Sequence, residues 1–365
     1  MTRSLVLEGP RNLRLQADDT PAIGPRDVHV RAALSGISHG TELSLYRGTS
    51  GFTDQVFDRE LRSFLPLDTP GSTYPAPLGY EFVGVVAEAG DEVTELSAGD
   101  LVHAGVPHRE DALLDLDGAL HMTYPLVRLP PGAPHERWLF VSLGMVALVA
   151  VHDARIKVGD HVAVFGLGAI GLLLVQLARM AGAARVTGVD PVAARRELAH
   201  GLGADAVLDP REAAAEGIGA TIKRAGGRGV DVSVETSGSS AALHGTIAAA
   251  GLGGRVVTVG FYQGGAPELR LGEEWHHNRL EMISSMGAWG APHRASPAWD
   301  RLRVARTIVD LLAAGWLKVD AFPIRHFRFE EAAEAYGWLD AHPDAAIKVA
   351  LTYDGTNPER RGGLQ

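Results

Sequence analysis

The chain has 365 residues, more than one hydrophobic core usually accommodates, so two domains are predicted. Its formal net charge of −10 and the lack of a long Lys or Arg run argue against binding to nucleic-acid phosphates. The sequence contains no cysteine, which excludes disulfides, thiolate nucleophiles and every metal site that needs sulfur.

The N-terminal sequence MTRSLVLEG lacks the basic and long apolar regions of a signal peptide. We find no uncharged apolar run that approaches the length of a membrane span. The sequence therefore predicts no membrane partner and a cytoplasmic location.

The region from about residue 28 to residue 130 is typical of a β-rich domain. Apolar runs at residues 28–34, 82–88 and 101–104 are separated by Gly, Pro and Asp, as strands and turns usually are. Residues 48–77 form a long insertion containing Gly, Pro, Ser and Thr. Irregular segments of this length are uncommon unless they cover a site or move, so the insertion is interpreted as a lid or as a solvated excursion.

The pattern changes near Ser142, where a helical pattern over residues 143–154 leads to an apolar strand. Strand and helix patterns then alternate. The strands are expected at residues 161–165, 185–189, 206–208, 231–235 and 255–259, and the helices at residues 172–181, 192–202, 213–224 and 240–250. This alternation predicts a doubly wound parallel sheet.

The last part of the chain has helical patterns at residues 299–314 and 330–341 and a strand pattern at residues 346–351. We predict that it packs back on the first domain. The polar, Gly-rich residues 354–365 are predicted to form a loose tail. The predicted domain boundaries are therefore 1–143, 144–286 and 287–365.

A glycine-rich turn follows the strand at residues 161–165. Gly166, Gly168 and Gly171 form a GxGxxG motif that opens a helical pattern, with Ala169 and Ile170 between them. Gly166 permits the tight turn, Gly168 lets the backbone approach a pyrophosphate, and Gly171 lets the helix pack closely on the strand. The helix N-terminus then faces the anion, so the motif predicts dinucleotide binding.

Asp190 ends the next strand, nineteen residues after Gly171. A carboxylate at this place accepts hydrogen bonds from the adenosine ribose and repels a 2′-phosphate, so NAD(H) is predicted rather than NADP(H). Arg195 and Arg196 follow it closely. They are interpreted as a solvated helix face, and contact with a phosphate is the alternative.

Two later strand ends are expected at the sheet edge where open α/β sheets bind ligands. Ser237 follows one of these strands, and Val259 and Gly260 follow the other. We predict that these residues line the adenine and nicotinamide ends of the cofactor.

The order of these parts resembles the medium-chain alcohol dehydrogenase-like superfamily. The resemblance covers nearly the whole chain. Its markers are GISHGTE at residues 36–42, YRG at 46–48, GYE at 79–81, AGD at 98–100, KVGD at 157–160 and the glycine motif. It implies an α/β fold with a GroES-like β-rich catalytic domain, interrupted by a Rossmann domain with a doubly wound parallel sheet.

The positions that hold zinc in related enzymes lack their usual ligands. The resemblance places a ligand Cys at His39 or Ser38 and a ligand His at Tyr80. The third ligand would fall near residues 141–143, which are Val, Ser and Leu, and the four-cysteine structural lobe is absent. Because a catalytic zinc needs about three protein ligands, we predict no zinc. A metal held by His39, Glu81 and water is the alternative.

Without zinc, a protein donor must stabilise the charge that builds on the substrate oxygen. Tyr80 and His39 are the predicted donors in reduction and acceptors in oxidation; a tyrosine would need a cation to lower its phenol pKa. The resemblance implies that Thr41 relays a proton and that Glu42 braces the site. Glu81 is predicted to orient His39 or to carry a proton.

The leading hypothesis is a zinc-independent, NAD(H)-dependent alcohol dehydrogenase or ketone reductase that acts on a small polar or biosynthetic intermediate. An enoyl or quinone reductase on the same scaffold is the alternative within catalysis. A non-catalytic dinucleotide-binding protein is the alternative from another class. The expected partner is a small-molecule substrate, and the resemblance implies a homodimer.

Overall fold

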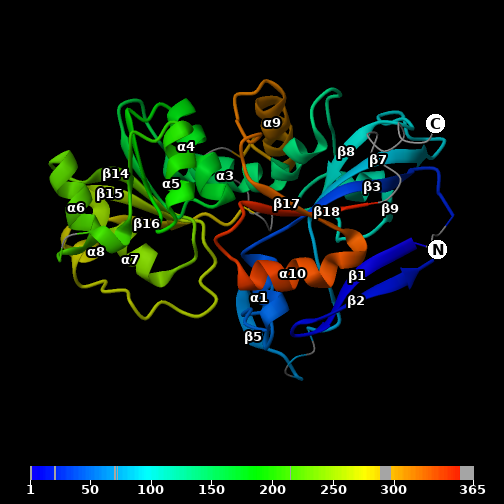
Figure 1. Cartoon of the computed structure of the whole chain (residues 1–365), viewed down its shortest axis with the longest axis horizontal. Coiled ribbons are helices and arrows are strands. Elements are labelled where there is room, and N and C mark those ends of the chain that lie inside the picture. The colour runs from blue at the N-terminus through cyan, green and yellow to red at the C-terminus, as the bar shows by residue number, and fades with distance from the viewer. Residues whose placement is uncertain are drawn as a thin grey trace. The chain divides into compact units, whose positions relative to one another are not determined.

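The computed structural model describes residues 2–19, 22–69, 71, 73–213, 215–287 and 297–353. The chain forms two compact units (Figure 1). Unit 1 contains Met1–Ser142 and Phe322–Gln365, and unit 2 contains Leu143–Ala321. The predicted tail at residues 354–365 lies outside the described residues.

The first boundary lies next to the predicted one, but the chain returns to unit 1 at Phe322 rather than at residue 287. The helix α9 (Arg301–Ala313) belongs to unit 2. Its Ile308 packs so closely on Gly144 of α3 (Val141–Ala154) that a Cβ on that glycine would lie 2.6 Å from a methyl group of Ile308. Buried apolar contacts of this kind hold α9 in unit 2.

Unit 1 is built mainly from strands. The strands β1 (Thr2–Gly9) and β2 (Asn12–Asp18) form an antiparallel hairpin, and β1 also pairs with β6 (Ala76–Pro77). The sequence interpretation missed this hairpin, because β2 has no buried residue and carries no apolar run. The larger sheet has the order β10 (Val127–Arg128), β8 (Leu101–Ala104), β7 (Glu81–Ala89), β3 (Asp27–Ile37), β18 (Lys348–Thr352), β17 (Ile324–Arg328), and β9 (Asp111–Asp115) pairs with β3.

The strand β3 is central to unit 1. It pairs with β7, β9 and β18 along its length. Burial alternates in its first half, as in a strand with one solvated face, and is continuous from Ala32 to Ile37. The GISHGTE motif therefore begins inside the core of unit 1. This core includes Leu5, Val30, Phe82, Phe329 and Tyr336.

The insertion at residues 48–77 is more regular than predicted. The strands β4 (Gln55–Asp58) and β5 (Ser63–Pro66) form an antiparallel hairpin within it. Phe57 and Phe64 pack edge to face across this hairpin, with ring centroids 5.1 Å apart. The role of the insertion as a lid stays a prediction.

Unit 2 confirms the predicted doubly wound sheet. Its six strands are all parallel. Their order is β13 (Ala206–Leu208), β12 (Arg185–Val189), β11 (His161–Phe165), β14 (Val230–Glu235), β15 (Ala250–Thr258) and β16 (Glu281–Ser284). Figure 1 shows α4 (Ala169–Met180) and α5 (Ala193–Gly201) on one side of the sheet, and α6 (Gly217–Gly226) and α7 (Ser240–Ala249) on the other. The strand order reverses between β11 and β14, which is where such sheets bind ligands.

One helical stretch corrects the prediction about apolar runs. His135–Ala154 is long and apolar enough to cross a membrane, because the 3-10 helix His135–Phe140 continues into α3. Within that stretch, 78% of the apolar window is buried, which is the pattern of a core helix in a folded protein.

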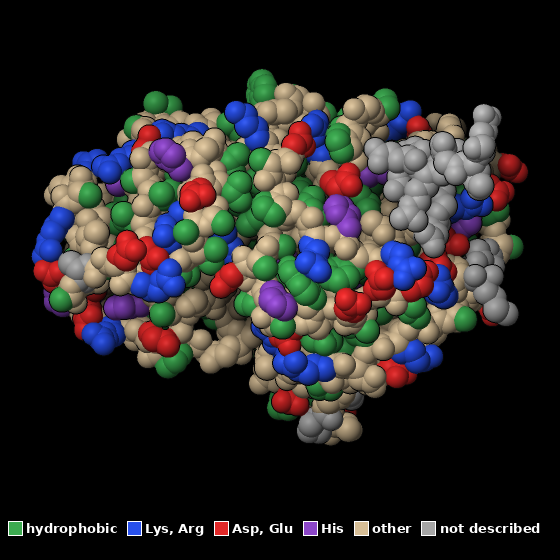
Figure 2. Space-filling model, viewed as in Figure 1, with side chains coloured by type: hydrophobic (Ala, Val, Ile, Leu, Met, Phe, Trp, Pro, Cys, Tyr) green, Lys and Arg blue, Asp and Glu red, His purple; other side chains and the backbone are tan. Residues whose placement is uncertain are grey.

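On the face shown in Figure 2, basic side chains are interspersed with acidic ones.

Candidate active site

The glycine motif forms a tight turn between β11 and α4. Gly166 has a φ of 86°, in the left-handed region that favours glycine. A Cβ on Gly171 would lie 1.9 Å from the carbonyl oxygen of Gly166, so only glycine lets α4 start this close to β11. A Cβ on Gly168 would meet nothing within 4 Å, so open space lies beside the start of α4, which begins at Ala169 and Ile170.

This turn fits the pyrophosphate of a dinucleotide. The first N–H groups of a helix have no partner within the helix, and the helix dipole favours an anion there. α4 has twelve residues, and its N-cap is Gly168, which makes no side-chain cap hydrogen bond. The residues that would hold a pyrophosphate are therefore those of the turn at residues 166–171.

We expect Gly168→Ala to keep the fold but to weaken NADH binding. The added methyl group would occupy the open space and cost about 1–3 kcal/mol as an overpacked contact, roughly 5- to 150-fold in Kd. Calorimetric titration with NADH measures this change. Gly201→Ala in α5 is the matched control, because a Cβ there also meets nothing within 4 Å. Equal NADH affinity in both variants would contradict the assignment.

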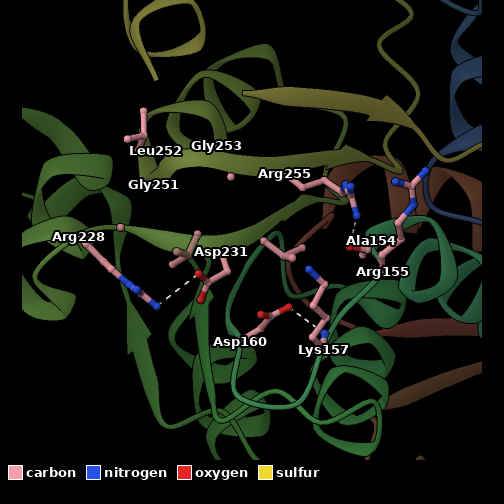
Figure 3. A pocket seen from close by; sticks show the side chains of 14 residues that line it. Ala154, Arg155, Lys157, Asp160, Arg228, Asp231, Gly251, Leu252, Gly253 and Arg255 are labelled. Atoms are coloured by element: carbon pink, nitrogen blue, oxygen red, sulfur yellow. Dashed lines mark hydrogen bonds and ion pairs between the residues drawn. The ribbon is translucent and has the colours of Figure 1, made fainter. Parts of the chain in front are cut away.

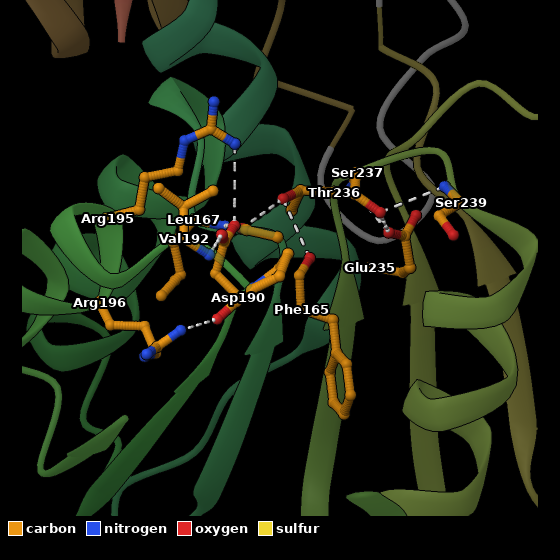
Figure 4. A network of polar contacts seen from close by, with 12 residues as sticks. Phe165, Leu167, Asp190, Val192, Arg195, Arg196, Glu235, Thr236, Ser237 and Ser239 are labelled. Carbon is orange, nitrogen blue, oxygen red and sulfur yellow. Dashed lines mark hydrogen bonds and ion pairs between the residues drawn. The ribbon is translucent and has the colours of Figure 1, made fainter. Parts of the chain in front are cut away.

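Asp190 lies buried directly after β12, beside the glycine turn (Figure 4). Its Oδ2 accepts a hydrogen bond from Leu167 N at 2.7 Å, and its Oδ1 accepts one from Val192 N at 2.8 Å. Each carboxylate oxygen has two lone pairs, so both can still accept a ribose hydroxyl. The structure thus places Asp190 against the turn, as a ribose-binding acid requires.

Arg195 and Arg196 are not a solvated helix face. Arg196 Nη1 donates to Asp190 O at 2.8 Å and to Asp209 Oδ2 at 3.0 Å. Arg195 Nη1 lies 4.0 Å from Asp190 Oδ2, and its side chain is 16% exposed. Both arginines fold back from α5 toward the end of β12 (Figure 4). The periodicity of a helix cannot reveal this, because it shows which face is polar but not what that face contacts.

The ends of β14 and β15 meet the glycine turn at the same edge. Val259 N and Gly260 N both donate to Glu235 O, at 2.8 and 3.2 Å. A Cβ on Gly166 would lie 2.9 Å from Ser237 Cβ. The structure therefore brings Ser237, Val259 and Gly260 together beside the turn; their contacts with a cofactor stay a prediction.

Glu235 and Thr236 organise this edge. They belong to the strand end that the sequence predicted to line the cofactor, but their contacts could not be predicted. Glu235 is buried, and its carboxylate accepts from Ser237 N at 2.7 Å and from the Tyr262 hydroxyl at 2.5 Å. Burial raises the pKa of Glu235, and the hydrogen bonds from Ser237 and Tyr262 oppose that rise. The Thr236 hydroxyl donates to Gly166 O at 2.8 Å. The local signal for both residues is their position at the end of β14, next to Ser237.

A separate cavity of about 430 Å³ lies in unit 2 (Figure 3). Asp160, which precedes β11, and Val230, which starts β14, both line it. It therefore lies at the amino ends of the strands, opposite the glycine turn. Two of its arginines are paired, Arg228 with Asp231 and Arg255 with Glu281. This cavity does not contribute to the dinucleotide edge.

In unit 1, Glu81 forms a buried ion pair. Its Oε2 lies 2.5 Å from Lys348 Nζ, and both side chains are at most 2% exposed. Lys348 Nζ also donates to Ile37 O at 3.1 Å. A Cβ on Gly36 would lie 2.2 Å from Glu81 Oε2, which explains the glycine that opens the GISHGTE motif. Lys348 is the ion-pair partner of this carboxylate. The predicted role of Glu81 in orienting His39 stays a prediction.

Tyr80 forms a hydrogen bond and an aromatic stack. Its hydroxyl donates to Ser38 Oγ at 2.5 Å. Its ring lies on that of Tyr124, with centroids 5.0 Å apart and planes 16° apart. Burial, and then the negative charges that Tyr124 and Glu81 carry when ionised, raise the pKa of Tyr80 well above its ordinary value. The surroundings of Tyr80 therefore raise its pKa rather than lower it, so the phenol keeps its proton near neutral pH.

Glu42 fixes the backbone next to this tyrosine. Its carboxylate accepts hydrogen bonds from Ser38 N at 2.8 Å, from His108 Nε2 at 3.0 Å and from the Tyr336 hydroxyl. Because a carboxylate accepts, His108 donates to it from Nε2. The chain of contacts continues from His108 Nδ1 to Ser35 Oγ at 2.7 Å and to the Tyr353 hydroxyl at 2.7 Å. These contacts fix Glu42 in place; its role in bracing a catalytic site stays a prediction.

The other predicted residues surround this arrangement. His39 is half-buried, and Thr41 is exposed at the first position of α1 (Thr41–Arg47). His103 is fully buried in β8, and its Nε2 lies 3.1 Å from Ser142 Oγ. Burial lowers the pKa of His103 to about 3, so this histidine stays neutral. The Ser142 hydroxyl donates to Tyr80 O at 3.2 Å, so it supports the backbone of Tyr80.

The donors at the usual zinc positions do not suit zinc. Glu81 is committed to the ammonium of Lys348, and the phenol of Tyr80 stays protonated. Within the described part of the chain, no group of three or more His, Cys, Asp or Glu side chains could hold a metal ion. No step of the chemistry below is assigned to a metal.

Two family models match the chain. Residues 24–113 match the alcohol dehydrogenase GroES-like domain, and residues 169–303 match the zinc-binding dehydrogenase model. The chain is 33% identical over 362 residues to D-guloside 3-dehydrogenase of Escherichia coli (strain K12), which covers 96% of this chain and 100% of that protein. It is 29% identical over 280 residues to (R,R)-butanediol dehydrogenase of Bacillus subtilis (strain 168), which covers 70% of this chain and 76% of the relative.

Among solved structures, a putative zinc-binding dehydrogenase of Sinorhizobium meliloti 1021 bound to NADP has the same fold. The TM-score is 0.74 at 24% identity, covering 96% of this chain and 99% of that one. The GroES-like and Rossmann parts, their order along the chain and the full-length relatives all agree. The chain therefore belongs to the medium-chain dehydrogenase/reductase superfamily.

Proposed function

We propose that this protein is a zinc-independent, NAD(H)-dependent dehydrogenase that interconverts a secondary alcohol and a ketone on a small polyol or glycoside. The observation that carries the proposal is the pairing of Tyr80 with Ser38 at positions where zinc-dependent relatives hold metal. A donor pair of this kind can stabilise charge on a substrate oxygen without a metal. The names of the guloside and butanediol dehydrogenases support a hydroxyl-rich substrate.

Asp190 supports NAD(H) as the cofactor. Its carboxylate retains lone pairs for ribose hydroxyls, and its negative charge opposes a 2′-phosphate. Bound nicotinamide supplies the group that accepts or gives the hydride. The residues that hold the cofactor in this proposal are Gly166, Gly168, Gly171 and Asp190.

The proton steps are assigned to unit 1. In ketone reduction, the Tyr80 hydroxyl, which donates to Ser38 in the free protein, gives its proton to the substrate oxygen instead, and Ser38 resupplies that proton. In alcohol oxidation the same path runs in reverse. Tyr80 accepts the hydroxyl proton of the substrate while its own proton passes to Ser38, and we assign the onward transfer to water to His39 and the exposed Thr41. Glu81 does not move a proton in this scheme. Its role is to fix the start of β7 through Lys348.

The alternatives from the sequence are weaker. An enoyl or quinone reductase usually uses NADPH, and Asp190 disfavours that cofactor. A protein that only binds dinucleotides would not require the hydrogen bond between Tyr80 and Ser38. The cytoplasmic location and the homodimer stay predictions.

A cofactor and metal experiment tests the proposal. We expect the purified protein, after exhaustive chelation, to oxidise 1,2-diols or methyl glycosides with NAD at its full rate. NADP should be used at least about tenfold less well, and Asp190→Ser should narrow this preference. Elemental analysis of the same sample gives the zinc content. Stoichiometric zinc together with loss of turnover on chelation would overturn the metal-free assignment, and an unchanged preference in Asp190→Ser would remove the argument for NAD.

A further inference from the structure

Tyr124 lies beside the proposed donor and has no role in the scheme above. It follows the short helix α2 (Leu116–Leu120) and precedes β10. A Cβ on Gly105 would lie 3.0 Å from Tyr124 Cβ, and Gly105 N donates to Tyr124 O at 2.9 Å. The end of β8 therefore fixes the backbone of Tyr124, and the stack on Tyr80 fixes its ring.

The hydroxyl of Tyr124 is available to a ligand. Among the described residues it has no hydrogen-bond partner, and its oxygen is not among the buried polar atoms left without one. The side chain is half-buried, so the ring is packed while part of the residue remains open to solvent. Tyrosine hydroxyls in such positions usually find a partner when a ligand closes over them.

The stack brings the rings of Tyr80 and Tyr124 to a centroid distance of 5.0 Å. Burial, and after it the charge of Glu81, raises the pKa of Tyr124, and the same carboxylate raises the pKa of Tyr80. Both phenols therefore stay protonated donors at neutral pH. Only one of them, Tyr80, already has an acceptor, which is Ser38.

We propose that Tyr124 is a substrate-contacting residue that recognises a second hydroxyl next to the carbon being oxidised, so that the site selects vicinal diols and sugar rings over simple alcohols. This inference rests on the proposed function. The two rings stack with centroids 5.0 Å apart, so a substrate oxygen held by Tyr80 leaves its neighbouring hydroxyl within reach of Tyr124. Tyr80 serves the reacting oxygen, and Tyr124 serves its neighbour.

Matched substrates test this proposal. Cyclohexanol and trans-1,2-cyclohexanediol differ by one hydroxyl, and NAD reduction measures their turnover. We expect Tyr124→Phe to raise KM for the diol roughly tenfold, the loss of one hydrogen bond, while the constants for cyclohexanol stay unchanged. Tyr124→Leu, which also removes the stack, should impair both substrates. Tyr74→Phe is the control. Tyr74 lies in the insertion, and the variant removes a tyrosine hydroxyl that donates to Leu45 O of α1 at 2.7 Å.

The outcomes separate this inference from the proposed function. If Tyr124→Phe turns over both alcohols with the wild-type ratio of KM for the diol to KM for cyclohexanol, the role of Tyr124 is refuted. The proposed dehydrogenase function would still stand. If no alcohol is turned over, calorimetric titration of the NADH-bound protein with methyl glycosides decides the question. Weaker binding in Tyr124→Phe than in Tyr74→Phe would then support the residue and refute the activity. Equal binding, or none, would refute both.

Discussion

Tyr80→Phe is expected to lower kcat for ketone reduction by roughly 100-fold or more, the usual effect of removing one donor to a developing oxyanion. The ring and its stack on Tyr124 remain in this variant, so the pocket keeps its shape. NADH affinity should change by less than about twofold, because the glycine turn that holds the cofactor belongs to unit 2. Steady-state kinetics and NADH titration of the same preparation measure both effects.

The pH dependence gives a second readout for the same residue. Because the pKa of Tyr80 is raised well above its ordinary value, the wild-type phenol should not titrate between pH 6 and pH 9. The rate of reduction should therefore show no loss attributable to this phenol as the pH rises through that window. Wild-type rates in Tyr80→Phe would move the donor elsewhere in unit 1, and His39→Ala is the next variant to measure.

Lys348→Met is expected to destabilise the protein by about 3–5 kcal/mol, the usual cost of leaving one member of a buried ion pair alone. Glu81 would then be a buried carboxylate without its ammonium partner. Burial already raises the pKa of Glu81 in the intact pair, and Lys348 opposes that rise. Without Lys348 the pKa of Glu81 should rise further, so that the folded state favours the protonated acid.

The sign of the pH effect follows from this shift. A carboxyl with a higher pKa in the folded than in the unfolded state costs stability as the pH rises above its unfolded pKa. The deficit of Lys348→Met should therefore be larger at pH 8 than at pH 5, as urea unfolding at both values measures. The double variant Glu81→Gln/Lys348→Met carries neither charge of this pair and should recover most of the loss. A deficit that is independent of pH, or a double variant no better than the single one, would contradict the ion-pair explanation.

The dinucleotide edge could be predicted from the sequence because its signals are local. Gly166, Gly168 and Gly171 lie within one turn, and Asp190 ends the very next strand. The spacing alone specifies a strand, a tight turn and a helix, and the structure has all three. The contacts of Arg196 could not be predicted, because its partner Asp209 lies beyond α5, and helical periodicity says nothing about it.

The site in unit 1 depends on contacts between distant residues. Glu42 and Tyr336 are 294 positions apart, and Ser35 and Tyr353 are 318 positions apart. A single sequence contains no signal for such pairs, so the ion pair of Lys348 with Glu81 was missed. Tyr124 was missed for another reason. It lies in a segment without a motif, and its only local signal is the glycine at the end of β8.

Unit 1 is built from two stretches of the chain that are separated by unit 2, and this determines the order in which the two units can fold during synthesis. Unit 2 is one uninterrupted stretch, Leu143–Ala321, and it emerges complete while unit 1 still lacks β17 and β18. Domains generally fold as units during synthesis. Unit 2 can therefore form first, whereas Glu81 must wait for Lys348, which is translated after unit 2. A nascent chain released early would hold a folded unit 2 joined to an incomplete unit 1 whose central strand β3 has an open edge, which is a known route to aggregation.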